Sequence, residues 1–192
     1  MKKLALALLV AASAACGRKP EAAKTATAPQ DAPVAGEKLI NYDAAGGAFS
    51  CRAPAAWKAV EDGYSGGPLV MFMGPAAGPR RGTASIGVAR YPSPGDPIKT
   101  PQEYAAMLAR TDGKPSALEA REVDGRTVYA LHYEVPQRAP RGRKTMYMNR
   151  EDAVLIPGAS GFFLLSHTAP ADGYQDTLPV FEAVVRSFRP KS

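Results

Sequence analysis

The chain has few of the side chains on which catalytic and metal centres depend. Its 192 residues include two histidines, two cysteines and one tryptophan. A metal site or a catalytic triad needs several such groups to converge, yet His132 and His167 each lie in a separate, mainly apolar segment. No complete catalytic motif is present. We therefore expect a non-enzymatic protein that has no catalytic residue, no metal and no cofactor.

A strong excess of one charge is also missing. The formal net charge is +6, from 24 basic and 18 acidic residues. Two of the basic residues, Lys2 and Lys3, belong to the N-terminal leader described below. A modest positive charge favours contact with anionic lipid head groups or acidic partners and does not indicate nucleic-acid binding.

The N-terminal apolar run is too short to cross a membrane. It covers residues 4–12, follows Lys2 and Lys3, and is followed by Ser13, Ala14 and Ala15. A membrane-spanning helix needs about 20 apolar residues. A basic start, a short apolar stretch and small residues are typical of a signal peptide that is removed. We expect residues 1–15 to be that signal peptide.

Cys16, directly after the three small residues, resembles a bacterial lipoprotein processing site. The resemblance implies that Cys16 is acylated, becomes the new N-terminus and anchors the protein to the lipid bilayer, on the periplasmic or extracellular face of the cell envelope. Ser13 stands where such sites usually have leucine, so an ordinary secreted protein cut after Ala14 or Ala15 stays open. Gly17 is not the aspartate often linked to inner-membrane retention, which favours the outer membrane.

A flexible linker and one folded domain are expected after the cysteine. Residues 17–37 are rich in alanine, proline, threonine and charge, with Val34 as the one large aliphatic side chain. Such a segment buries too little apolar surface to offset its ordering entropy. We expect residues 16–37 to be the lipidated cysteine and its linker. Residues 38–192 are then long enough for a single domain.

Cys51 lies in an alternating segment and has no intrachain partner if Cys16 is lipidated. We expect it to be a small buried apolar residue of a strand. If Cys16 is not lipidated, a disulfide between Cys16 and Cys51 is an alternative in an oxidising compartment.

Most of the domain is expected to be β-strand. Asp124-Gly125 between two alternating segments predicts a hairpin, and the residues around Ser160 predict a second one. Leu69–Met73 is continuously apolar and predicts a central strand buried on both faces. The strands are expected at 39–43, 48–52, 57–60, 69–73, 83–91, 117–123, 126–135, 145–148, 152–156 and 162–168.

Two helices complete the domain. Thr100, Pro101 and Glu103 predict a capped helix start. Leu178, Phe181, Val185 and Phe188 recur at helical spacing and predict a helix over about 176–188. Strands and helices do not alternate, so a doubly wound parallel sheet is excluded. The fold class is α+β, with a twisted antiparallel sheet flanked by helices.

This order of elements resembles the PsbP-like fold, which an extrinsic photosystem subunit, a nuclear-import factor and many small bacterial lipoproteins share. The residues that carry the resemblance are Phe49–Trp57, Asp124-Gly125-Arg126, Tyr174–Phe181 and Ser187-Phe188. The resemblance covers most of residues 39–190 and implies a binding or assembly role. It supplies no shared catalytic residue.

Three groups of residues are candidate functional sites. The densest basic cluster is a candidate contact for lipid head groups or an envelope protein partner, with solvated loop charge as the alternative; it consists of Arg138, Arg141, Arg143 and Lys144. His132 and Glu134 are two apart in a strand and share a face, although a polar outward face is expected for both histidines. Ser160 only loosely matches the Gly-x-Ser-x-Gly nucleophile motif.

The sequence therefore predicts a membrane-anchored lipoprotein of the cell envelope. It would act as a non-enzymatic binding, assembly or adaptor module. The alternative is a carrier of a small hydrophobic ligand in a cleft between the sheet and a helix. The least favoured hypothesis is a hydrolase that uses Ser160 or His132.

Overall fold

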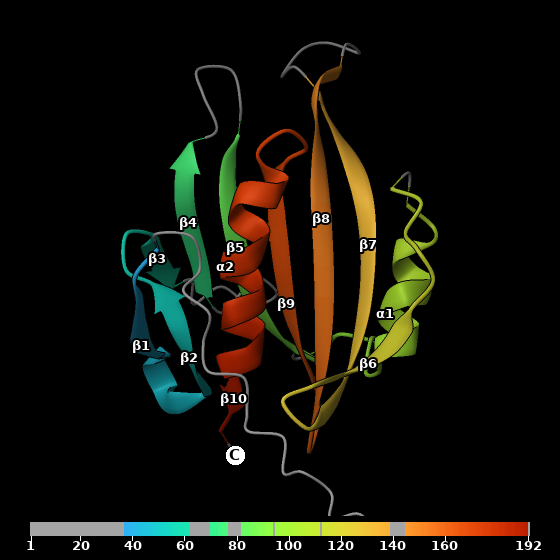
Figure 1. Cartoon of the computed structure of the whole chain (residues 1–192). Helices are drawn as coiled ribbons and strands as arrows, with labels where there is room; N and C mark the ends of the chain where they lie inside the picture. The colour runs from blue at the N-terminus through green and yellow to red at the C-terminus, as the bar shows by residue number, and fades with distance from the viewer. Residues whose placement is uncertain are drawn as a thin grey trace, which may run out of the picture. The chain divides into compact units, whose positions relative to one another are not determined.

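The computed structural model describes residues 37–61, 70–76, 82–93, 95–111, 113–138 and 145–191. Within them, two antiparallel sheets and two α-helices form a single compact body (Figure 1). The expected α+β class is thus confirmed. The elements are β1 (Leu39–Asp43), β2 (Phe49–Pro54), β3 (Lys58–Glu61), β4 (Val70–Ala76), β5 (Thr83–Tyr91), α1 (Pro101–Leu108), β6 (Glu119–Val123), β7 (Arg126–Arg138), β8 (Thr145–Gly158), β9 (Gly161–Pro170), α2 (Tyr174–Ser187) and β10 (Arg189–Pro190).

The larger sheet has seven strands in the order β3-β4-β5-β9-β8-β7-β6. Both expected hairpins are present: Asp124-Gly125 joins β6 to β7, and Ala159-Ser160 joins β8 to β9. Asp124 and Gly125 both adopt positive φ, at 51° and 70°, as a tight two-residue hairpin requires. The segments expected at 145–148 and 152–156 are parts of one strand, β8.

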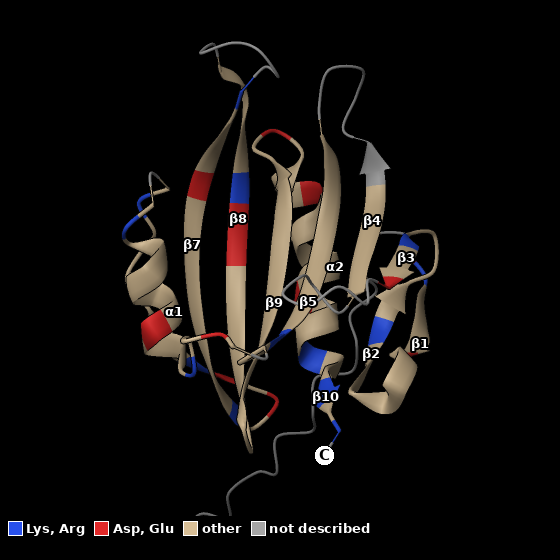
Figure 2. Cartoon of the chain, turned by 180° about the vertical axis from the view of Figure 1, so that it is seen from behind, with Lys and Arg blue, Asp and Glu red and all other residues tan. Residues whose placement is uncertain are grey.

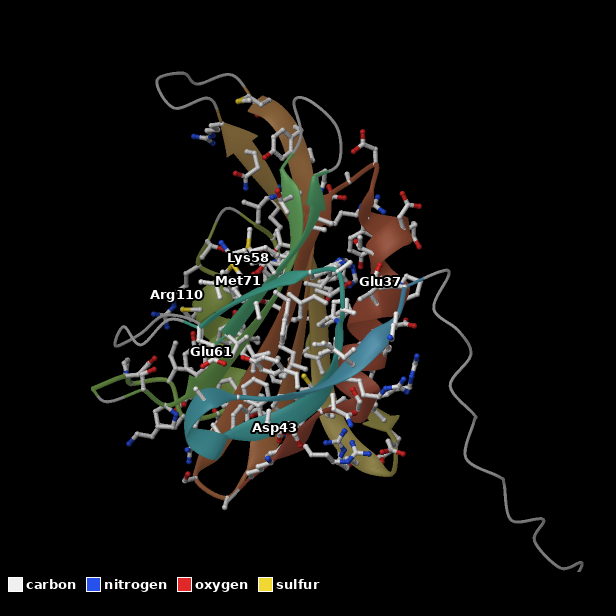
Figure 3. The ribbon with its side chains drawn as sticks, turned by 90° about the vertical axis from the view of Figure 1, so that its left-hand side faces the viewer. Glu37, Asp43, Lys58, Glu61, Met71 and Arg110 are labelled. Carbon is white, nitrogen blue, oxygen red and sulfur yellow. The ribbon has the colours of Figure 1, made fainter. Side chains whose placement is uncertain are left out.

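The smaller sheet brings the two ends of the described chain together. Its order is β1-β2-β10, so the last strand pairs with β2 although it is the last element of the chain. The Tyr42 hydroxyl donates a hydrogen bond to Glu61, which ties β1 to the edge strand β3. Figure 3 looks at this edge, with Asp43, Lys58 and Glu61 labelled.

Helix α2 and the small sheet cover one face of the large sheet. The core between them is built from side chains such as Phe49, Ile86, Leu165 and Phe181, which are at most 2% exposed. Phe49 stacks on Phe188 with 5.0 Å between ring centroids. Cys51 is buried in this layer and is a free thiol, as expected. Burial, with a smaller effect of Asp43, raises the pKa of this thiol to about 12, so the sulfur is inert.

Helix α1 covers part of the opposite face. Its capping box forms as expected, because the Thr100 side chain accepts from the Glu103 amide while Glu103 accepts from the Thr100 amide. Tyr104 and Leu108 pack on β7, β8 and β9. No residue of β4 belongs to this second core among the described residues, so Met71 and Met73 stay half-buried. The expectation that this strand is central and buried on both faces was therefore wrong.

Two arginines satisfy the carbonyl groups at the end of α2. Arg126 donates to the Phe188 oxygen at 2.7 Å and to the Val185 oxygen at 3.4 Å. Arg189 donates to the Arg186 and Phe188 oxygens and pairs with Asp124. The last carbonyls of a helix have no partner within the helix, and positive charge there is favourable. The first residue of β7 is thereby joined to the last turn of the final helix.

Candidate functional site

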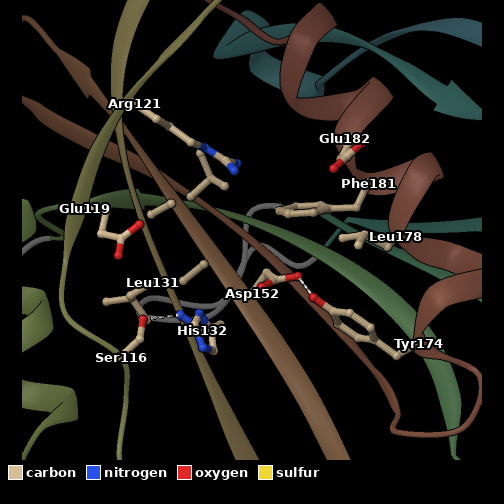
Figure 4. Close-up of a pocket in the computed structure, with 13 residues that line it drawn as sticks. Ser116, Glu119, Arg121, Leu131, His132, Asp152, Tyr174, Leu178, Phe181 and Glu182 are labelled. Atoms are coloured by element: carbon tan, nitrogen blue, oxygen red, sulfur yellow. Dashed lines mark hydrogen bonds between the residues drawn. The ribbon is translucent and has the colours of Figure 1, made fainter. Parts of the chain in front are cut away.

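A cleft lies between α2 and strands β6, β7 and β8, on the face that α2 only partly covers (Figure 4). The volume of the cavity is about 220 Å³. Its wall on α2 is formed by Tyr174, Leu178, Phe181 and Glu182, and its floor is formed by the strands. The lining residues of the floor and rim are Ser116, Glu119, Arg121, Ala130, Leu131, His132, Asp152, Ala153 and Val154.

Three polar side chains form a row across the floor of this face. Register places His132 of β7 opposite Asp152 of β8, and Asp152 opposite His167 of β9. Because side chains of paired residues share one face, the carboxylate lies between the two imidazoles. His132 is exposed and lines the cleft, whereas His167 is fully buried beneath α2. The expectation of an outward position thus held for His132 and was wrong for His167, because β9 is a central strand that α2 covers.

His167 fixes α2 on the sheet. Its Nε2 lies 2.9 Å from the Thr177 hydroxyl, and its ring stacks on Phe181 with 5.3 Å between centroids. Its Nδ1 lies 4.0 Å from an Asp152 carboxylate oxygen and has no hydrogen-bond partner among the described residues. A buried polar ring that is held from two sides positions the helix without taking part in the exposed cleft.

Asp152 stays ionised at the bottom of the cleft. Burial raises the pKa of this carboxyl, but His167 and the hydrogen bond from the Tyr174 hydroxyl outweigh that effect and hold it below its ordinary value. The same pairing and burial raise the pKa of Tyr174, which stays protonated and remains a donor. Tyr174 uses one carboxylate oxygen, Oδ2, and the described residues give the other, Oδ1, no hydrogen bond.

The rim carries two further charged side chains, Glu119 and Arg121 of β6. Neither side chain makes a hydrogen bond or an ion pair with any residue that the structure describes. Across the cleft, Glu182 pairs with Arg186 at 3.8 Å along α2. Figure 4 shows the Arg121 side chain extending from β6 toward the α2 side of the cavity. The cleft therefore offers a free guanidinium and several carboxylates to a ligand.

Among the described residues, no base accepts a hydrogen bond from Ser160, the candidate serine, or from Ser116, which lines the cleft. Ser116 accepts a hydrogen bond from the His132 backbone amide, not from the imidazole, and itself donates to the Ala117 carbonyl. Ser160 accepts from the Arg90 guanidinium at 3.0 Å. A nucleophilic serine needs a neighbouring base that accepts its proton. Glu134 pairs with Arg150 at 3.2 Å, so the His132–Glu134 pair considered from the sequence is not formed.

The basic cluster and the lipidation site lie largely outside the described residues. Arg138 is the exposed last residue of β7. Cys16, Arg141, Arg143 and Lys144 lie outside the described residues, and so does the linker. Within the described ranges, no group of three or more histidine, cysteine, aspartate or glutamate side chains is arranged to hold a metal ion. In the same ranges, no helix has the length and apolar character needed to cross a membrane.

Charged residues of both signs occur on the long strands β7 and β8 (Figure 2). No motif of the sequence marks Arg121 or Asp152 as a site residue, and Tyr174 belongs there only to the stretch that carries the fold resemblance, Tyr174–Phe181. One signal for Asp152 was available: a carboxylate directly before the apolar run Ala153–Ile156 lies at the border of a buried strand. Its partner on α2 is 22 residues away, and no local pattern connects the two.

No protein-family model matches this chain, and no curated protein matches it in sequence. Similar solved structures do exist. LpqN of Mycobacterium tuberculosis, described as involved in cell envelope biogenesis, is 13% identical and aligns over 81% of this chain and 91% of its own, with a TM-score of 0.52. The cyanobacterial PsbP of Synechocystis sp. PCC 6803 is 18% identical over 81% of this chain and 94% of its own, with a TM-score of 0.49. PA94 of Pseudomonas aeruginosa, a protein of unknown function, is 18% identical over 80% of this chain and 98% of its own, and its TM-score is also 0.49.

These similarities concern the fold alone. The chain is similar in fold to LpqN and to the cyanobacterial PsbP, which is the resemblance that the sequence predicted. Identities this low carry no residue role and no ligand from one protein to another. The function has to be argued from the cleft itself.

Proposed function

We propose that the protein is a non-enzymatic binding module of the bacterial cell envelope, and that the cleft between α2 and β6–β8 is its binding site. The observation that carries the proposal is a cavity that contains the ionised Asp152 and whose rim carries Glu119 and Arg121, two side chains without a partner among the described residues. A cavity with apolar lining and a few convergent polar groups is the usual form of a ligand site.

Ser116 donates to a backbone carbonyl and Ser160 accepts from Arg90, and among the described residues no base accepts a proton from either hydroxyl, which favours a binding role over hydrolysis. The fold likeness to LpqN, which is described as acting in envelope biogenesis, is consistent with an envelope location. The expected lipid anchor at Cys16 would hold the domain at the bilayer through the linker. Mass spectrometry of the mature N-terminus tests the anchor, and a free, unacylated N-terminus would refute it.

The adaptor role proposed from the sequence involves a second surface, the basic residues Arg138, Arg141, Arg143 and Lys144. In-cell crosslinking of the tagged full chain, followed by purification from membranes and mass spectrometry, tests it. One dominant protein that is lost on charge reversal of Arg141 and Arg143 would support an adaptor. Equal recovery of that protein with the charge-reversed variant would show that Arg141 and Arg143 are not part of the interface.

The binding module itself is tested by ligand screening. The mature chain is titrated with polar envelope metabolites and, separately, with a fatty acid and a hydrophobic dye, while amide NMR signals are recorded. We expect polar compounds to shift the signals of Arg121, His132 and Asp152. Binding of the hydrophobic compounds in the same cleft would favour the ligand-carrier alternative. No shift of these signals by any compound would refute the proposed site.

A further inference from the structure

The cleft carries opposite charges at its two ends. Arg121 lies opposite Val128 on β7, while Asp152 lies opposite His132 on the same strand. Val128 and His132 are four residues apart, which corresponds to about 13 Å along a strand. A cation therefore marks one end of the floor and an ionised carboxylate marks the other.

Both end groups have unused hydrogen-bonding capacity. The Arg121 guanidinium makes no bond to any described residue, and a guanidinium binds a carboxylate through two parallel hydrogen bonds. Asp152 keeps Oδ1 available while Tyr174 holds Oδ2 in place. His167 and Tyr174 orient this carboxylate from below and from α2, so it is positioned before a ligand arrives. Glu119 lies between the two ends, opposite Ala130, and adds a second carboxylate along the path.

The size of the cavity limits what it can hold. At about 220 Å³ it is smaller than the pockets of roughly 300–1,000 Å³ that take drug-sized ligands. An acyl chain or a sterol does not fit this volume together with the charged lining. A peptide of two or three residues is about 7 to 10 Å long when extended. With one hydrogen bond added at each terminus, that length is comparable to the offset of Val128 and His132 along β7.

The remaining lining suits small side chains. Ala130 is a small residue of the floor, on the same face as Asp152, and Val154, Leu178 and Phe181 form the apolar part of the lining. A small floor residue leaves space for a ligand backbone between the strands and the helix.

We propose that the cleft binds short zwitterionic peptides of two or three small residues, with the ammonium group at Asp152 and the carboxylate at Arg121. This inference rests on the proposed binding function and specifies its ligand. It assigns one recognition role to each end: Asp152 and Glu119 select a free amino terminus, and Arg121 selects a free carboxyl terminus.

The test uses three forms of one probe. Trialanine, N-acetyl-trialanine and trialanine amide are titrated into the mature chain by calorimetry and by amide NMR. We expect trialanine to bind and each blocked form to bind at least about tenfold more weakly, because one charge-assisted contact is lost. Equal binding of the three forms, or no binding of trialanine, would overturn the inference.

Variants separate the two ends. Arg121→Gln should remove the preference for the free carboxylate while keeping the preference for the free amine, and Asp152→Asn should do the reverse. Arg110→Gln is the matched control, since Arg110 is exposed at the end of α1 and does not line the cleft (Figure 3). Because Asp152→Asn also touches the α2 contact, Glu119→Gln serves as a second test of amine recognition at an exposed position.

The outcomes distinguish this inference from the proposed function. If trialanine does not bind but another polar compound shifts the signals of Arg121 and Asp152, the peptide assignment is wrong and the proposed binding site is retained. If no compound shifts them, both are wrong.

Discussion

Adjacent side chains of β8 have opposite electrostatic environments. Glu151 and Asp152 point to opposite faces of the sheet, as neighbours in a strand must. Burial, only partly offset by hydrogen bonds from Tyr133 and Thr168, raises the pKa of Glu151. Asp152 is shifted the other way by His167 and Tyr174, against the effect of burial. Each residue therefore makes stability depend on pH, with opposite sign.

The two dependences are separable by substitution. Asp152 contributes stability above its unfolded pKa, near 3.8, and loses it as the pH falls through the lower folded value. Glu151 is favourable below its unfolded pKa, near 4.5, and becomes unfavourable as the pH rises. We expect the free energy of unfolding of Asp152→Asn to fall less between pH 5 and pH 3 than that of the wild type. We expect Glu151→Gln to be more stable relative to the wild type at pH 7 than at pH 4. Urea unfolding at pH 3, 4, 5 and 7 measures both, and parallel curves for wild type and variants would contradict them.

Gly161 is a second residue whose role follows from local geometry. Its φ is +141°, and a Cβ atom there would lie 1.9 Å from the Tyr91 carbonyl oxygen. Because that oxygen belongs to backbone, it cannot move aside easily. We expect Gly161→Ala to lower the free energy of unfolding by about 3 kcal/mol or more.

Gly95→Ala is the control for that substitution. Gly95 also has a positive φ, at +84°, but open space surrounds its Cβ position. We expect a cost of about 1 kcal/mol from the backbone conformation alone. Equal destabilisation by the two substitutions would show that the contact with Tyr91 does not matter.

At the scale of elements, the start of α1 depends on one cap. Thr100 satisfies an amide of the first turn, and Tyr104 and Leu108 then pack on the sheet. We expect Thr100→Ala to cost about 1 kcal/mol and Thr100→Ser to cost much less, because serine keeps the acceptor. Denaturant unfolding compares the two, and similar losses would assign the effect to packing of the methyl group.

The end of α2 depends on a residue from another element. Arg126 belongs to β7 and donates to two carbonyls of the last turn of α2. We expect Arg126→Met to destabilise the protein by about 2 kcal/mol, since hydrogen bonds from a charged donor are lost while the aliphatic part of the side chain is kept. Arg121→Met, on the neighbouring strand and without a partner among the described residues, should have little effect on unfolding.

Local patterns predicted most elements, because the information lies within a few residues. Asp124-Gly125 predicts its hairpin through the φ values that it allows, and Thr100 to Glu103 predict a cap. The burial of His167 and the half-exposure of Met71 depend on which part of the sheet α2 and α1 cover, and no short window contains that information. A cleft between the sheet and a helix was expected as an alternative, but its polar lining was missed for the same reason: Arg121, Asp152 and Tyr174 come from three elements.

At the scale of the whole molecule, location depends on residues far from the cleft. If Cys16 carries the acyl anchor, Cys16→Ser should move the protein from the membrane fraction to the soluble periplasmic or extracellular fraction. Two acyl-type anchors bind a bilayer stably, whereas a modest positive charge does so weakly and reversibly. Fractionation at low and high salt measures this change. Retention of the variant at high salt would point to an anchor other than Cys16.

The pairing of β10 with β2 means that this domain can complete its folding only after its last strand is available. Phe49 packs against Phe188, and the Lys191 amide donates to the Ala48 carbonyl. A chain that is synthesised or exported with its N-terminus first exposes Phe49 long before Phe188 arrives. Nearly the whole length must therefore be available before this part of the core can pack. Until then, Phe49 lacks its stacking partner and β2 lacks β10, so a delay in the release of the last few residues prolongs the exposure of these groups.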